Sequence, residues 1–235
     1  MDVYENIVIG SFLYGLGLKM GVGAGGLGSE PTSISLFQQT PLDRPLSDLL
    51  FANPRIIRIF EFKRRDNESN KELVKRGLLE DALAGQEMAP LAAISREIHW
   101  YVESDYRHEG GQTLAMPYLD FPARSDVQDL TAFIDRLIRE AATPANDQKL
   151  SLSKEYLNVL LRLALGAKGG SGTFIVSVTG GGGLQFVHLP DVQELFMTPQ
   201  MIIDRRLEQE RAIVQQRQHQ RQPDRSPSRG PIIER

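Results

Sequence analysis

The sequence predicts a mixed α/β fold, because segments with helical periodicity alternate with segments that have the two-residue period of strands. Its 235 residues are enough for one domain with appendages. Hydrophobic residues make up 41% of the chain and charged residues 24%, as in proteins that pack a hydrophobic core. We therefore expect a mixed sheet flanked by helices, then a region of helices and a hairpin, and finally a disordered tail.

The first 105 residues contain the elements of an α/β core. Apolar residues recur at helical spacing from Tyr4 to Lys19, and Gly21 lies where a C-cap is expected. A later helix has Ser69 as its expected N-cap, with Glu72 three residues on. The expected elements are a helix over 4–19, a strand over 33–38, a hairpin of strands 46–51 and 55–63 around a turn at 52–54, a helix over 69–84 and a strand over 98–102.

Residues 106–200 are expected to complete or extend the same domain. Amphipathic patterns predict helices over 126–142 and 153–166, the first opened by Asp126 and the second by Ser153. Strands over 173–178 and 184–189 flank four consecutive glycines and predict a second hairpin. Beyond residue 201 a charged helix is expected to fade into an Arg/Gln-rich tail, which ends at residue 235 and lacks any apolar period.

Composition excludes several kinds of chemistry. The chain has no cysteine, so disulfides, thiolate catalysis and thiolate metal sites are ruled out. A formal net charge of −3 argues against a protein coated in positive charge, but a local nucleic-acid groove is compatible with it. The apolar stretch over 7–28 is interrupted by Ser11 and Lys19 and dissolves into glycines, so a buried helix is a simpler explanation than a membrane span. We expect a cytoplasmic protein.

The first hairpin carries the best functional clue. Glu61 and Lys63 end an otherwise apolar strand, where two charges are unusual. If the turn is centred between Asn53 and Pro54, Asp48 lies opposite Ile59 and shares its face with Glu61 and Lys63. A one-residue shift of the turn would move Asp48 to the other face, so the inference depends on register.

Converging carboxylates and a lysine suit phosphodiester hydrolysis. Mg²⁺ prefers oxygen ligands and commonly takes only one or two protein carboxylates. Such a metal polarises a phosphoryl oxygen and lowers the pKa of a bound water. A neighbouring lysine can orient that water or stabilise negative charge that develops in the transition state.

These residues resemble the PD-(D/E)xK nuclease superfamily. The resemblance covers residues 1–105: a helix bearing Glu5, a strand, Asp48 and Glu61-x-Lys63 on adjacent strands, then a helix and a strand. It implies a restriction-endonuclease-like core and a Mg²⁺- or Mn²⁺-dependent nuclease, with DNA the favoured substrate and a role in restriction, repair or phage defence. The sequence departs from the family pattern because Pro45 is separated from Asp48 by two residues.

The resemblance also implies individual roles. Asp48, Glu61 and Glu5 would be metal ligands, with Asp48 and Glu61 acting in catalysis beside Lys63, the catalytic lysine. The same reading makes Arg64 and Arg65 nucleic-acid contacts at the strand end, and Gln38 a supporting group.

Other interpretations stay open. Glu61 and Lys63 could be charges at the rim of the sheet, with Asp48 capping a turn. The segment Gly21-Val22-Gly23-Ala24-Gly25-Gly26 matches the G-x-G-x-x-G pattern of dinucleotide-binding proteins. It follows a helix and precedes a strand, whereas that fingerprint follows a strand and opens a helix, so the context argues against dinucleotide binding. The trio His99-Trp100-Tyr101 could stack on bases, but core positions on a sheet are the commoner use. The rival function is a non-catalytic assembly module whose tail tethers a protein partner.

Overall fold

The computed structural model describes residues 4–23, 32–36, 47–65, 70–105, 112–164, 173–178, 184–189 and 211. The chain divides into two compact units, residues 1–195 and residues 196–235, and Arg211 is the described residue of the second. The helices and strands given below all belong to the first unit. The expected tail, Gln38 and most of both glycine-rich loops lie outside the described residues.

The first unit is built on one mixed sheet, which confirms the predicted α/β class. Its described strands follow the order β6-β5-β4-β3-β2-β1-β7-β8. The β3–β4 pair is parallel, and the other neighbouring pairs are antiparallel. The strands are β1 (Thr32–Leu36), β2 (Leu49–Ala52), β3 (Ile57–Arg64), β4 (His99–Asp105), β5 (Gln112–Pro117), β6 (Gln128–Asp129), β7 (Thr173–Val178) and β8 (Leu184–Leu189).

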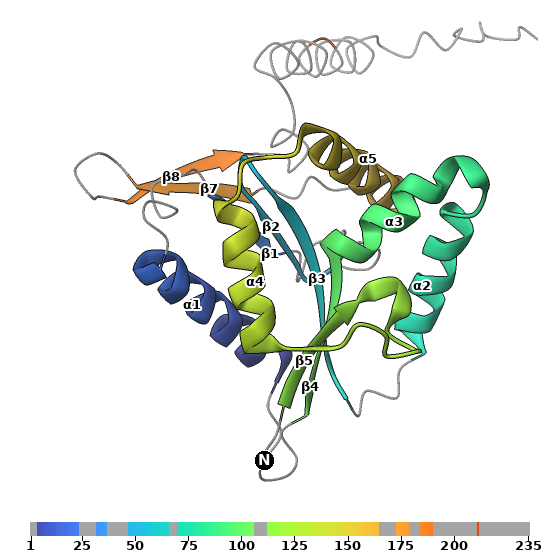
Figure 1. Ribbon diagram of the computed structural model, residues 1–235, viewed down its shortest axis with the longest axis horizontal. Helices are drawn as coiled ribbons and strands as arrows, with labels where there is room; N and C mark the ends of the chain where they lie inside the picture. Colours follow the sequence, from blue (N-terminus) through green and yellow to red (C-terminus); the bar gives the residue numbers. More distant parts are fainter. Residues whose placement is uncertain are drawn as a thin grey trace, which may run out of the picture. The chain divides into compact units, whose positions relative to one another are not determined.

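Helices cover both faces of this sheet (Figure 1). On one face, α1 (Glu5–Gly23) packs against α4 (Leu130–Ala142) and β3. On the other face lie α2 (Lys71–Ala82), α3 (Ala89–Ile98) and α5 (Asp147–Ala164), with α3 and α5 in close contact. Short 3₁₀ turns, η2 (Gln86–Met88) and η3 (Tyr118–Asp120), precede α3 and follow β5. The parallel β3–β4 connection therefore passes through α2 and α3, as parallel strands require a crossover.

Aromatic rings of β3 form the core beneath α1 and α4. Phe60 and Phe62 point to the same face because strand side chains alternate. Phe12 of α1 lies 5.0 Å from Phe60 and 5.6 Å from Phe62 between ring centroids, and Phe133 of α4 lies 6.0 Å from Phe60. The odd-numbered residues of β3, including Glu61 and Lys63, consequently face the α2 side.

The structure corrects several expected boundaries. The helix expected from Asp126 begins at Leu130, because Asp129 is the N-cap and its carboxylate accepts the Thr131 amide at 2.8 Å. The helix expected from Ser153 begins six residues earlier, at Asp147. The second helix has Asn70 as its N-cap without a side-chain hydrogen bond, and Ser69 lies outside the described residues.

Two regions were not expected from the sequence. Helix α3 and strand β5 fall in segments to which no element had been assigned, and strand β6 occupies part of the segment where the helix over 126–142 was expected. Both strands of the second hairpin have the expected bounds, 173–178 and 184–189, and pair antiparallel. Within the described part of the chain, no helix is long and apolar enough to cross a bilayer.

Candidate functional site

Three carboxylates from separate elements converge on the amine of Lys63. The Lys63 Nζ lies 2.8 Å from Glu61 Oε1, 3.6 Å from Asp48 Oδ2 and 3.8 Å from Glu5 Oε2. Glu61 and Lys63 come from β3, Asp48 immediately precedes β2, and Glu5 begins α1. The structure thus brings together the residues that sequence reasoning had assigned to metal binding and catalysis.

The hairpin register differs from the expected one, but the face of Asp48 does not. Leu49 pairs with Phe60 and Ala52 with Ile57, so the turn is centred between Pro54 and Arg55. The expected partner of Asp48, Ile59, pairs with Leu50 instead, which is a shift of two residues and preserves the side-chain face. The Asp48 carboxylate accepts the Phe62 amide at 2.6 Å and so fixes the start of β2 against β3.

The side chain of Asn53 explains the position of the turn. Its Oδ1 accepts the backbone amides of Arg55 and Ile56, both at 2.9 Å. The backbone amide of Asn53 also donates to the Ile56 carbonyl at 3.0 Å. These bonds make Pro54 and Arg55 the two loop residues, because an asparagine side chain can mimic a backbone turn.

Helix α2 adds two residues to the site that sequence reasoning had missed. Lys75 Nζ lies 3.3 Å from Glu61 Oε1 and 2.8 Å from Glu72 Oε1. Glu72, expected only to support the helix N-terminus, is buried and faces the sheet. The i,i+3 spacing of Glu72 and Lys75 puts both on one helix face, which is a signal available in the sequence. We call the resulting group the acid–lysine cluster, and it consists of Glu5, Asp48, Glu61, Lys63, Glu72 and Lys75.

Burial and like charge set the protonation of the cluster. Burial and the Asp48 carboxylate raise the pKa of Glu61 to about 8. Burial alone would lower the pKa of Lys63, but the carboxylates of Glu61 and Asp48 outweigh it and raise that pKa above its ordinary value. The Lys63 ammonium therefore keeps its charge at neutral pH. Burial also raises the pKa of Glu5.

A buried polar chain connects the cluster to the helices behind it. The Tyr118 hydroxyl donates to Glu72 Oε2 at 3.1 Å, and the Tyr118 ring stacks on His99 with 4.2 Å between centroids. The two ring nitrogens of His99 lie 2.9 Å from Ser47 Oγ and 2.7 Å from the Tyr156 hydroxyl. Burial lowers the pKa of His99 to about 3, so it is neutral and structural.

The cluster contains more acid than base. Its four carboxyl groups face two ammonium groups, which leaves a surplus of two carboxyl groups. Among the residues that the structure describes, no three His, Asp or Glu side chains are already arranged as ligands of one metal ion. Lys63 lies between the carboxylates, so these oxygen donors would have to turn away from it to share a cation.

The two arginines after Lys63 differ in exposure. Arg64 is half-buried, whereas the Arg65 side chain is 53% exposed. Arg65 Nη1 lies 3.3 Å from Asp105 Oδ2 and its Nε lies 3.8 Å from Glu103 Oε1. Their expected contact with nucleic acid stays a prediction.

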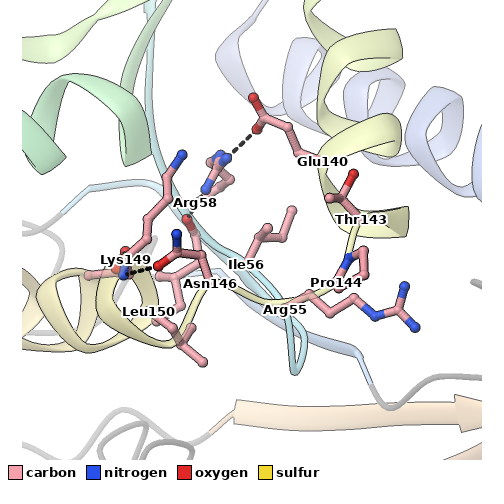
Figure 2. A pocket seen from close by; sticks show the side chains of 11 residues that line it. Arg55, Ile56, Arg58, Glu140, Thr143, Pro144, Asn146, Lys149 and Leu150 are labelled. Atoms are coloured by element: carbon pink, nitrogen blue, oxygen red, sulfur yellow. Dashed lines mark hydrogen bonds and ion pairs between the residues drawn. The ribbon is translucent and has the colours of Figure 1, made fainter.

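A separate cavity of about 250 Å³ lies at the opposite end of β3. Figure 2 shows Arg58 of β3 reaching toward Glu140 of α4, while Arg55 points away from Arg58. Arg55 Nη1 donates to the Ala142 carbonyl at 2.7 Å and so caps the end of α4. Cations of this cavity thus have partners within the fold, and sequence reasoning assigned it no role.

Comparisons of the chain with protein-family models, with curated proteins and with solved structures found no match. The acid–lysine cluster is therefore interpreted from its own geometry.

Proposed function

We propose that the chain is a metal-dependent phosphodiesterase that acts on nucleic acid, with DNA the favoured substrate. The observation that carries the proposal is the convergence of Glu5, Asp48 and Glu61 within 4 Å of the Lys63 amine. The order of helix α1, strand β1, the Asp48 strand, the Glu61-x-Lys63 strand, helices and strand β4 also supports it, because the PD-(D/E)xK resemblance implies that order.

The donor chemistry of the cluster fits a hard divalent cation. Asp48, Glu61 and Glu5 offer carboxylate oxygens, the ligands that Mg²⁺ and Mn²⁺ prefer. The surplus of two carboxyl groups leaves negative charge for such a cation to balance. A bound Mg²⁺ would polarise a phosphoryl oxygen and generate a hydroxide nucleophile from water.

The protein groups have separable tasks in this proposal. Lys63 is a permanent cation, so it stabilises negative charge on the phosphoryl group rather than abstracting a proton. Lys75 holds Glu61 and Glu72 in place from α2, which makes it a positioning residue. Arg65, at the exposed strand end, would contact a phosphate of the substrate backbone.

The test is cleavage of plasmid, linear duplex, single-stranded DNA and RNA in the presence of Mg²⁺ or Mn²⁺. We expect metal-dependent cutting by the wild type and at least a hundredfold loss in Lys63→Ala, as removal of one charge-stabilising group typically costs about 10²–10³ in rate. Lys19→Ala is the matched control, because Lys19 pairs with Asp135 of α4 and does not belong to the acid–lysine cluster. Equal activity of Lys63→Ala and Lys19→Ala would refute the assigned role of Lys63, and absence of cutting by the wild type would refute the nuclease proposal.

A further inference from the structure

Helix α1 has an outer face that is uncharged and largely apolar, with Ser11 as an exposed polar residue on it. Tyr4, Ile7, Tyr14 and Leu18 are 68%, 53%, 71% and 50% exposed. The charged residues of α1 are used elsewhere, since Glu5 contacts Lys63 and Lys19 pairs with Asp135. A largely apolar helix is normally buried, yet within the described part of the chain α1 is covered on the side of Phe12 and Leu16 alone.

The outer face has a ridge and a groove side by side. At 100° per residue, Ile7, Tyr14 and Leu18 fall in one row along the helix. Gly10, Gly17 and Gly21 fall in the neighbouring row, each three residues after one of the large side chains. A Cβ placed on these glycines would meet no described atom within 4 Å, so the groove is open and is not needed for packing within the monomer.

We propose that this face of α1 binds a second copy of the chain, as a two-fold symmetric dimer. A two-fold axis parallel to the helices sets the large side chains of each copy against the glycines of the other, so the face is complementary to itself. The absence of charge on the face means that pairing buries no ion. The inference does not depend on the proposed nuclease function.

The area of the face is sufficient for a specific contact. At the observed exposures the four apolar side chains offer roughly 500 Å² per copy. Pairing two copies then covers about 1,000 Å² in total, which is the lower limit for a specific protein interface. Parallel pairing also places the Glu5-bearing ends of the two α1 helices, and with them both acid–lysine clusters, at the same end of the dimer.

The test is the solution mass of the full chain by light scattering, with two matched variants. We expect a mass twice the chain mass of 26.3 kDa for the wild type. Gly17→Gln fills the groove and should give the single-chain mass, whereas Gly77→Gln, an equally open helical glycine on α2, should leave the dimer intact. Glutamine favours helix over glycine, so neither variant is expected to unfold, and melting curves check this.

Engineered cysteines test the parallel arrangement, because the chain has no other cysteine. Ile7→Cys should form a disulfide-linked dimer on oxidation, since parallel pairing brings the two copies of residue 7 to the same height. Antiparallel pairing would instead bring residue 7 close to residue 21 of the other copy. A wild type of single-chain mass at high micromolar concentration, or a dimer that Gly17→Gln leaves intact, would overturn the proposal.

Discussion

The two ends of β3 both bury charged side chains, but they balance the charge differently. Near the hairpin turn, the Arg58 side chain is 3% exposed and pairs with Glu140, and its Nη1 donates to the Ile57 carbonyl at 2.7 Å. At the other end, Glu61 is 2% exposed and lies in a cluster with two more carboxyl groups than ammonium groups.

This difference separates a structural ion pair from a candidate active site. A buried cation with its own carboxylate and a backbone acceptor is satisfied within the fold. Buried carboxyl groups in surplus repel one another, and that repulsion destabilises the metal-free protein. Strain of this kind is typical of functional sites, where stability is sacrificed for chemistry. We therefore expect substitutions at the two ends to change stability in opposite directions.

The largest effect is expected at the hairpin end. Glu140→Ala removes the carboxylate with which Arg58 pairs and leaves the Arg58 guanidinium buried without it. Arg136, whose Nε lies 3.8 Å from Glu140 Oε1, loses the same carboxylate. Arg58 is buried, but Glu140 is itself 35% exposed, so the free energy of unfolding should fall by about 3 kcal/mol, the low end for loss of one partner of a buried pair. Urea denaturation measures it. If the free energy of unfolding changed by less than about 0.5 kcal/mol, as for exposed ion pairs, the burial of Arg58 would not require the Glu140 carboxylate.

At the cluster end, Glu61→Gln should stabilise the metal-free protein at alkaline pH. The pKa of Glu61 is raised from 4.5 to about 8, so the stability that its protonated form contributes is lost as the pH rises from 4.5 through 8. Glutamine removes the negative charge, and the free energy of unfolding at pH 9 should exceed that of the wild type by at least about 2 kcal/mol, while at pH 4.5 the two should agree.

The matched control for this measurement is Glu80→Gln on the exposed side of α2, where Glu80 pairs with Arg76. Denaturation curves with a chelator present should show no comparable alkaline gain for that variant. A Glu61→Gln protein less stable than the wild type at pH 9 would mean that the surplus charge is not a source of strain.

A smaller effect is expected from His99, which links the cluster to α5. Its pKa is lowered from 6.5 to about 3 by burial, so the unfolded chain binds a proton that the folded protein excludes. This group should lower the free energy of unfolding by about 1 kcal/mol between pH 7 and pH 5.5. His99→Gln removes the contribution, and equal pH slopes for the two proteins would contradict it.

The sequence was sufficient to predict which side chains of the first hairpin share one face, but not to predict every residue of the acid–lysine cluster. The alternation of side chains along β3 placed Glu61 and Lys63 on one face. Asp48 stayed on that face because the register shifted by two residues, and an even shift does not change the face of a side chain. Lys75 and Glu72 were missed because the role of a helix face can be assigned only when the surface against which it packs is known. Nothing in the local pattern says that α2 packs over Glu61.

The fold shows the same limit. The helix over 4–19 and both hairpins were predicted from local periodicity and turn residues. Strand β5 was not, because Gln112 to Pro117 lacks regular alternation and is fixed instead by pairing with β4. The turn position was misjudged because the Asn53 side chain, rather than Pro54 alone, determines which residues form the loop.

The most direct test of the account is the melting temperature of the wild type, Asp48→Asn and Glu140→Ala with and without Mg²⁺ or Mn²⁺. Ligand binding stabilises the folded state by about 2.7 kcal/mol at a hundredfold excess over the Kd. We predict a metal-dependent rise for the wild type and for Glu140→Ala, although the latter starts from a lower melting temperature, and no rise for Asp48→Asn. An equal rise in all three proteins, or none in the wild type, would contradict the claim that the carboxylate surplus around Lys63 is a cation site.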